Sequence, residues 1–182
     1  MYRRNFLKLA CASGAISILP AVRRAAAAQA GPFIDGEMYA LECLGNEHTA
    51  FKFLDGRTGD GSVALAPTTN PPFSGTKWRA SVRAGNFVLL ECQGTIEGPR
   101  VLDGHTADHS VHLALSATGG FSGTLWQVVA PNDATTNLKC MGNDNPNLFL
   151  DGVTHDGTVR LSNSTAPPFT GTRWRVIPFG TI

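Results

Sequence analysis

The chain has 182 residues, of which 42% are hydrophobic and 16% charged, and its 15 Lys and Arg against 14 Asp and Glu give a formal net charge of +1. Five of the basic residues and none of the acidic ones lie in positions 1–30, so residues 31–182 carry ten basic and 14 acidic side chains, a net charge of −4. No basic patch remains there, which argues against nucleic acid or an anionic membrane surface as the main partner.

Residues 1–30 are expected to be a targeting segment. Arg3-Arg4-Asn5-Phe6-Leu7-Lys8 is similar to the bacterial twin-arginine export motif, and Ala28-Gln29-Ala30 has the form of a cleavage site. The apolar stretch between them, Leu9–Val22, is too short and too rich in Gly and Ser to span a bilayer well. An ordinary secretory leader with a chance Arg pair is the alternative. Both predict an exported protein, periplasmic or extracellular, without membrane insertion.

The remaining chain contains one unit written three times. Two motifs each recur twice at intervals of 48 residues: Leu-Asp-Gly-x-Thr from Leu54, Leu102 and Leu150, and Gly-Thr-x-Trp from Gly75, Gly123 and Gly171. A fixed period of this size marks stacked or radially arranged copies of one supersecondary unit. We place the copies at 38–86, 87–134 and 135–182, within a single domain covering 31–182.

Each copy is predicted to contain four short strands. Alternating apolar residues mark the first strand, as in Val88, Leu90 and Cys92. The second strand ends in the Leu-Asp-Gly motif, and a pair such as Asp60-Gly61 predicts a two-residue hairpin turn into the third strand. A longer loop follows, and the fourth strand begins at the Trp. No helical periodicity occurs after residue 31.

Alternation assigns the repeated cysteines and tryptophans to the core. Cys43, Cys92 and Cys140 share their strand face with Leu, so we interpret them as small buried residues. An odd number of cysteines cannot be fully paired, although a single disulfide or a three-thiolate metal site remains as the alternative. The Trp of each copy falls on the same inward face as Val and Ala.

Twelve strands in three near-equal copies favour a closed three-fold barrel. A propeller typically needs at least four blades, and an open solenoid needs distinct capping copies. The chain resembles the β-trefoil family, most closely its ricin-B-like lectin branch, whose repeats carry a Leu-Asp segment, an Asp-Gly hairpin, a Val-x-Leu strand and a Gln-x-Trp in the same order. The resemblance covers residues 38–182. It implies an all-β β-trefoil of three four-stranded repeats with pseudo-threefold symmetry.

The resemblance also implies a ligand site in each copy. In ricin-type lectins the Asp of the Leu-Asp segment accepts hydrogen bonds from sugar hydroxyls, which by position points to Asp55, Asp103 and Asp151. The family's Gln is replaced by Thr, and its aromatic platform on the third strand is missing. A loop residue of each copy could supply the stacking face instead, or could simply close the bottom of the barrel: Phe73, Phe121 and Phe169.

Hairpin register predicts which side chains accompany these aspartates on an outward face. Two-residue turns would set three pairs opposite one another: Arg57 with Ala64, His105 with His112, and Val153 with Arg160. His112 and Arg160 therefore join the candidate ligand-binding residues. The alternative is that all three aspartates are structural, because Asp followed by Gly is a common turn pair.

One cluster occurs in the second copy alone. His105, Asp108, His109 and His112 lie on its hairpin, and His105 with His112 would form a workable pair of imidazole ligands. Surface histidines on a turn are nevertheless common, so we assign no metal ion and no cofactor.

No catalytic motif is found in the sequence. The recurring acids are 48 residues apart and related by the three-fold, too far for the two carboxylates of a glycosidase, so we expect no enzymatic activity. The favoured function is lectin-like binding of a glycan or polysaccharide through up to three weak, equivalent sites, with avidity from multivalency. The alternative is a non-catalytic protein-interaction or structural domain with a protein partner, whose repeated motifs serve folding only.

Overall fold

The computed structural model describes residues 27–45, 50–118, 122–132, 135–143, 147–167 and 170–179. The twin-arginine motif and the apolar stretch fall outside these ranges, as do Phe121 and Phe169, so export and the roles of those two rings stay predictions. None of the helical segments among the described residues has the length and hydropathy of a bilayer-spanning helix.

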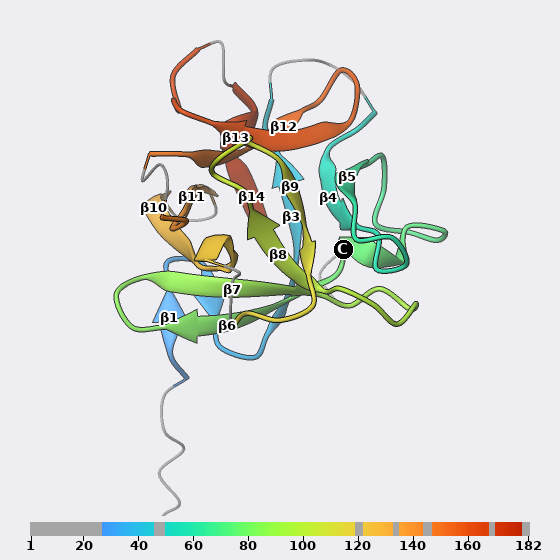
Figure 1. Cartoon of the computed structure of the whole chain (residues 1–182), viewed down its shortest axis with the longest axis horizontal. Coiled ribbons are helices and arrows are strands. Elements are labelled where there is room, and N and C mark those ends of the chain that lie inside the picture. The colour runs from blue at the N-terminus through green and yellow to red at the C-terminus, as the bar shows by residue number, and fades with distance from the viewer. Residues whose placement is uncertain are drawn as a thin grey trace, which may run out of the picture.

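The described chain is built from strands and three short 3₁₀ turns (Figure 1). In chain order the elements are β1 (Gln29–Ala30), β2 (Phe33–Ile34), β3 (Met38–Cys43), β4 (Phe53–Gly56), β5 (Val63–Ala66), η1 (Ser74–Thr76), β6 (Trp78–Arg83), β7 (Phe87–Cys92), β8 (Val101–Gly104), β9 (Val111–Ala114), η2 (Ser122–Thr124), β10 (Trp126–Asn132), β11 (Thr135–Cys140), β12 (Phe149–Val153), β13 (Thr158–Ser162), η3 (Thr170–Thr172) and β14 (Trp174–Pro178).

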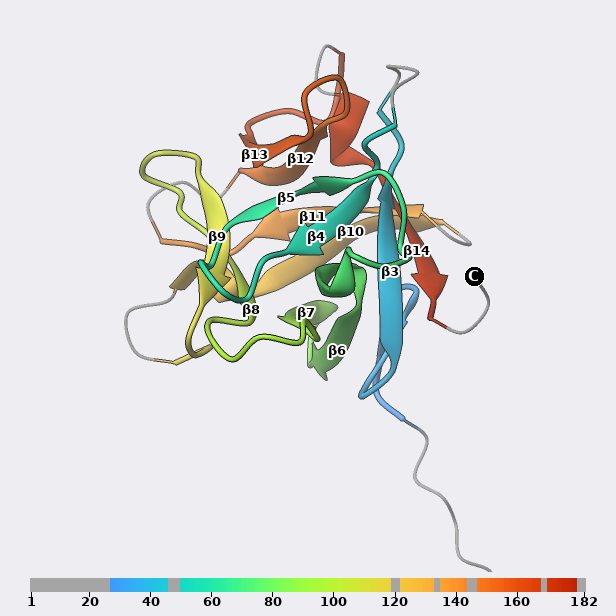
Figure 2. The same cartoon turned by 90° about the vertical axis from the view of Figure 1, so that its right-hand side faces the viewer.

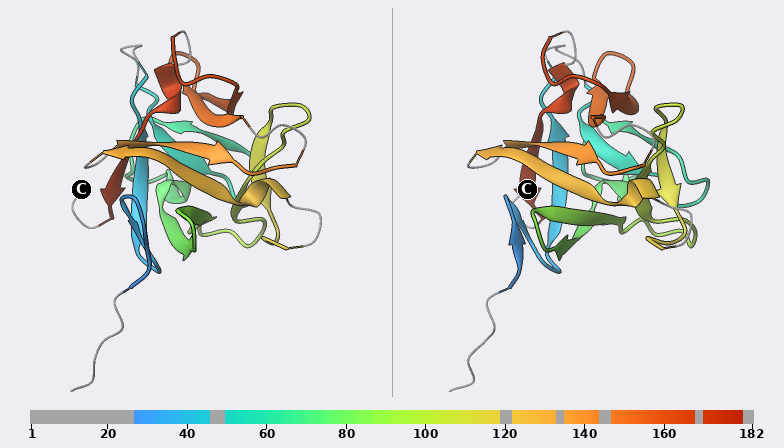
Figure 3. Two further views of the ribbon diagram at one scale, coloured as in Figure 1. Left: turned by 90° about the vertical axis from the view of Figure 1, so that its left-hand side faces the viewer. Right: turned by 60° about the vertical axis from the view of Figure 1, so that its left-hand side comes forward.

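The longer strands form a closed antiparallel ring. Strand β3 pairs with β6, β6 with β7, β7 with β10, β10 with β11, β11 with β14, and β14 returns to β3. Closure satisfies the backbone groups that an open sheet would leave at its edges. The β1–β2 pair lies at the end of the barrel away from the β12–β13 hairpin (Figure 3).

The shorter strands form three hairpins, β4–β5, β8–β9 and β12–β13 (Figure 2). Each hairpin is tied to the next by a backbone hydrogen bond of 2.7–2.9 Å, from Leu65 to Gly157, from Leu113 to Gly61 and from Leu161 to His109. This triangle of hairpins fixes the turns that carry the candidate site residues.

The β-trefoil class predicted from the sequence is corrected to a closed antiparallel β-barrel with additional strands. Hydrogen bonding joins twelve strands into one sheet that closes on itself, and its strands pair both within a copy, as β3 does with β4 and β6, and between copies, as β6 does with β7. The physical reason is that a sequence period gives the number of copies and the strand positions. It does not give the partners between which the backbone hydrogen bonds run.

The core is assembled from equivalent positions of the three copies, as alternation predicts. Trp78, Trp126 and Trp174 are completely buried, and each indole N–H donates to the carbonyl of the Leu that begins the Leu-Asp-Gly motif, at 2.9–3.0 Å. The three cysteines are buried too, and their thiols donate to backbone carbonyls. Their assignment as core residues is therefore confirmed.

Candidate functional site

The hairpin turns are longer than the two residues that Asp-Gly predicts. In the first copy the amide of Arg57 donates to the carbonyl of Ser62, which leaves four residues in the turn. The Asp60 carboxylate accepts from the Ser62 amide at 2.9 Å and from its hydroxyl at 2.7 Å, an arrangement that fixes the wider turn. The predicted cross-strand partners are therefore wrong by two residues, and Asp55, not Arg57, lies opposite Ala64.

A shift of two residues keeps every side chain on its predicted face, because side chains alternate with a period of two. The shift also places an ionisable side chain directly opposite two of the three aspartates. Asp103 now lies directly opposite His112, and Asp151 directly opposite Arg160. The register thus brings each repeated carboxylate next to the variable side chain of its own hairpin.

The three aspartates keep their predicted face of the hairpin but are buried there, whereas the sequence predicts that they are exposed. Asp55, Asp103 and Asp151 are 6%, 1% and 3% exposed. A 3₁₀ turn packs over each one so closely that a Cβ on Gly75 would lie 2.7 Å from an Asp55 oxygen and 1.9 Å from the Gly56 carbonyl oxygen. Only Gly permits this approach, which explains the repeated Gly of the Gly-Thr-x-Trp motif.

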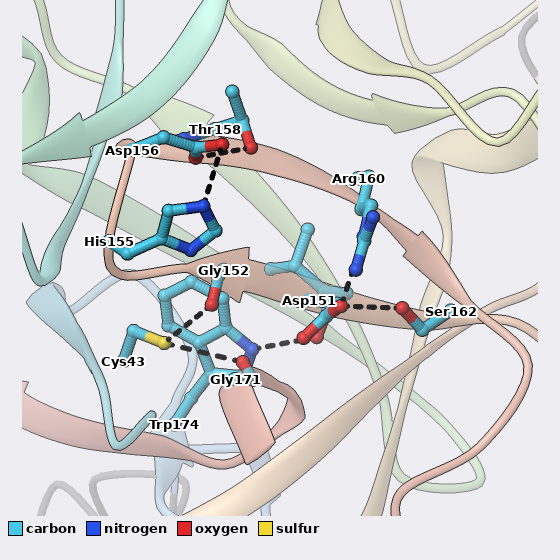
Figure 4. A network of polar contacts seen from close by, with 11 residues as sticks. Cys43, Asp151, Gly152, His155, Asp156, Thr158, Arg160, Ser162, Gly171 and Trp174 are labelled. Carbon is cyan, nitrogen blue, oxygen red and sulfur yellow. Dashed lines mark hydrogen bonds and ion pairs between the residues drawn. The ribbon is translucent and has the colours of Figure 1, made fainter. Parts of the chain in front are cut away.

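Asp151, in the third copy, is satisfied within the protein (Figure 4). Its Oδ2 accepts from the Ser162 hydroxyl at 2.5 Å and from Arg160 Nε at 3.3 Å. These two donors occupy the acceptor sites of Oδ2, which are therefore not free for a sugar hydroxyl. The predicted pair Asp151 and Arg160 thus forms an internal ion pair.

Asp103, in the second copy, faces two histidines instead. Its Oδ2 lies 3.8 Å from Nε2 of His105 and 3.8 Å from Nε2 of His112. Burial raises the pKa of Asp103, and the nearby His112 and His105 act in the opposite direction.

Asp55, in the first copy, opens onto a pocket. Among the described residues it has no ion pair of the kind made by Asp103 and Asp151. Burial raises the pKa of its carboxyl, while the charge of Arg57 and a hydrogen bond from the Gly75 amide lower it. Asp55 is one of the residues that line the cavity described next.

We call this cavity the Asp55 pocket. It has a volume of about 390 Å³, and its walls include Asp55, Arg57, Asp60, Pro72, Phe73 and Ile96. The structure therefore brings together Asp55 and Phe73, which the sequence singled out separately. A second cavity of about 380 Å³ shares Pro72, Phe73 and Ser74 with the first, so Phe73 borders both.

Sequence reasoning missed Asp60 and Ile96 as parts of this pocket. Asp60 was interpreted as a turn residue, and hydrogen bonds from Ser62 lower its pKa. Ile96 lies in the loop between β7 and β8 and is 61% exposed, unusually open for a large apolar side chain. The signal available in the sequence was an aliphatic residue in an otherwise polar loop, at a position where the other two copies have Glu47 and Asp144.

No family model and no curated protein matches the chain. Among solved structures, it is similar to a GlcNAcα1-4Gal-releasing endo-β-galactosidase from Clostridium perfringens, with a TM-score of 0.60 and 19% sequence identity. The match covers 78% of this chain and 32% of that one, so this chain spans about a third of the enzyme's length. At this identity the likeness concerns the fold.

The expectation that this chain is not an enzyme is corrected by that finding. It relied on the absence of known motifs and on the distance between the repeated acids. The same fold nevertheless occurs within a glycoside-cleaving enzyme. In addition, the Asp55 pocket places two carboxylates of a single copy, Asp55 and Asp60, on one cavity, an arrangement that the 48-residue spacing of the repeated acids does not reveal.

Proposed function

We propose that this protein binds a carbohydrate in the Asp55 pocket. The observation that carries the proposal is the meeting of a carboxylate, a guanidinium and an aromatic ring on one open cavity. Sugars offer adjacent hydroxyls on their edges and apolar C–H faces, and these are the groups that such a wall accommodates. The fold likeness to a galactoside-cleaving enzyme supports the same ligand class.

The roles within the pocket follow from the chemistry of each side chain. The Asp55 carboxylate accepts hydrogen bonds from sugar hydroxyls, and Arg57 donates to ring or hydroxyl oxygens. Phe73, which is half-buried, presents a ring for the C–H face, with Pro72 and Ile96 as further apolar walls. A pocket of about 390 Å³ lies within the range of small-ligand sites, which suits one or two sugar units.

The three copies are not equivalent under this proposal. Asp151 already has Arg160 and Ser162 as partners, and Asp103 has two histidines. The first copy is therefore the principal sugar site, in place of the three equal sites expected from the repeats.

Asp55→Asn is expected to weaken glycan binding by roughly 10-fold to 100-fold, because a hydrogen bond to a charged group contributes about 1.5–3 kcal/mol. The Asn oxygen can still accept from the Gly75 amide, so the fold should be retained. The measurement is a glycan array, followed by titration calorimetry with the best ligand.

Asp151→Asn is the matched control, since it makes the same change where the carboxylate is held internally. It should leave affinity unchanged. Equal losses in both variants would contradict the proposal that the first copy is distinct, and no binding by the wild-type protein to any glycan would reject carbohydrate recognition.

Glycan hydrolysis is a second candidate, favoured by one observation. Asp55 and Asp60 line the same pocket, and burial raises the pKa of Asp55 while hydrogen bonds lower that of Asp60. Divergent pKa values are what a general acid and an ionised carboxylate require.

If the pair is catalytic, the wild-type protein will release reducing ends from a galactoside polymer, and Asp55→Asn and Asp60→Asn will each abolish release. Release by either variant at the wild-type rate would exclude this mechanism.

A further inference from the structure

The second hairpin holds a cluster of metal-ligating groups that the proposed glycan site does not use. Asp103 at the end of β8, His105 just after it and His112 in β9 each offer one ligand atom, and these atoms all lie within 4.8 Å of one another. The cluster exists because Asp103 and His112 are direct cross-strand partners, while His105 lies two residues further along the same face.

The buried carboxylate of this cluster is under-satisfied. Asp103 is 1% exposed, and its Oδ1 has no hydrogen-bond partner among the described residues. Its Oδ2 contacts the two imidazoles at 3.8 Å, which is longer than a hydrogen bond. By contrast, Asp151 has Arg160 and Ser162, so the deficit belongs to the second copy. A buried anion without hydrogen bonds is costly unless a cation compensates it.

The geometry of the two rings suits a shared ion. Nε2 of both histidines faces the same carboxylate oxygen, and the ring centroids are 4.1 Å apart with planes at 72°. Ligand atoms on a tetrahedral zinc ion, with bonds of about 2.0–2.1 Å, are separated by about 3.4 Å. Movements of a few tenths of an ångström would bring each Nε2 to that separation from Oδ2.

The cluster is also accessible from one side. The His105 side chain is 50% exposed and that of His112 is 35% exposed, whereas Asp103 forms the buried floor. An ion could therefore enter from solvent, and water could complete its coordination. Three protein ligands with an open position are characteristic of exchangeable or catalytic sites rather than closed structural ones.

We propose that Asp103, His105 and His112 bind a divalent transition metal ion, with zinc as the first ion to test. Two neutral imidazoles and one carboxylate suit zinc and its neighbours in the first transition series. Calcium and magnesium prefer ligand sets made of oxygen atoms. The site is separate from the Asp55 pocket, because none of its three residues lines that cavity.

The test is calorimetric titration of zinc chloride into the chelator-treated protein. The wild type should bind one zinc ion, and the double substitution His105→Ala/His112→Ala should weaken binding by at least about 100-fold, beyond the 10-fold to 100-fold cost of losing an outer-shell partner. Asp103→Asn should also weaken binding. Unchanged emission of the buried tryptophans would show that the variants are folded.

Two other histidines provide matched controls. His109 lies in the turn of the same hairpin, and His155 contacts Asp156 on the third hairpin. His109→Ala and His155→Ala should leave zinc affinity within about twofold of the wild type. In nuclear magnetic resonance spectra, zinc should shift the imidazole signals of His105 and His112 but not those of the controls. Absence of zinc binding by the wild type, or an equal loss in His109→Ala, would overturn the proposal.

Discussion

Trp126→Ala should lower the free energy of unfolding by about 3–5 kcal/mol, which is a large fraction of the stability of a small domain. The indole is completely buried, and its N–H donates to the Leu102 carbonyl at 3.0 Å. Removing it leaves a cavity in the core and takes the hydrogen-bond partner from the Leu102 carbonyl. Urea unfolding followed by circular dichroism would measure the change.

Trp126→Phe separates the two contributions. It keeps most of the buried apolar area and removes the hydrogen bond, so a smaller loss of about 1–3 kcal/mol is expected. If Trp126→Ala cost less than about 1 kcal/mol, the indole could not be a central element of the core.

Gly75→Ala should destabilise the protein by about 3 kcal/mol or more, although only one methyl group is added. The new Cβ would lie 1.9 Å from the Gly56 carbonyl oxygen and 2.7 Å from Asp55 Oδ1. Overpacking commonly costs about 1–3 kcal/mol, and here the obstructing atom belongs to the backbone and cannot rotate away. Thermal and urea unfolding would measure the loss, and glycan binding should fall with it because Asp55 would be displaced.

Gly59→Ala is the matched control for that substitution. A Cβ at Gly59 would meet only side-chain atoms of Ile96, at 3.4 Å or more, which is ordinary contact. We expect a change within about 0.5 kcal/mol, as at other unconstrained surface positions. Equal effects at Gly59 and Gly75 would show that the close approach of the 3₁₀ turn does not govern stability.

Much of the local structure could be predicted from one physical rule, the alternation of inward and outward side chains along a strand. The Trp of the repeat recurs at intervals of 48 residues at an inward-facing position. Alternation alone therefore places Trp126 in the core, where it lies in the structure. The same alternation located the strands around Cys92 and Val111. Patterns of this kind depend on the nearest neighbours along the chain, which the sequence displays directly.

The remainder depended on interactions that no local pattern contains. The hairpin register was wrong because Ser62 binds Asp60 and widens the turn, a choice that Asp-Gly by itself does not reveal. Burial of Asp55 was missed because a turn 20 residues later folds over it. The β-trefoil class failed for a related reason, since pairing between copies is a property of the closed sheet and not of one repeat.

The candidate site, too, could be predicted only in part from the sequence. Asp55 and Phe73 could be selected from the repeats, but their meeting in one pocket with Ile96 required the folded chain. The sequence singles out Asp103 and the two histidines for different reasons, and the cross-strand pairing of Asp103 with His112 brings them into one cluster.

The pairing of β14 with β3 has a consequence for chain connectivity. Val176 lies opposite Leu41 and Pro178 opposite Tyr39, so β14 meets β3, the first strand of the three copies, much as β6 meets β7 and β10 meets β11. A chain that begins at β3 could therefore be cut at the exposed turn between β6 and β7 and joined across the β14–β3 pair by a short linker. The resulting circular permutant would begin and end at a different point of the same ring.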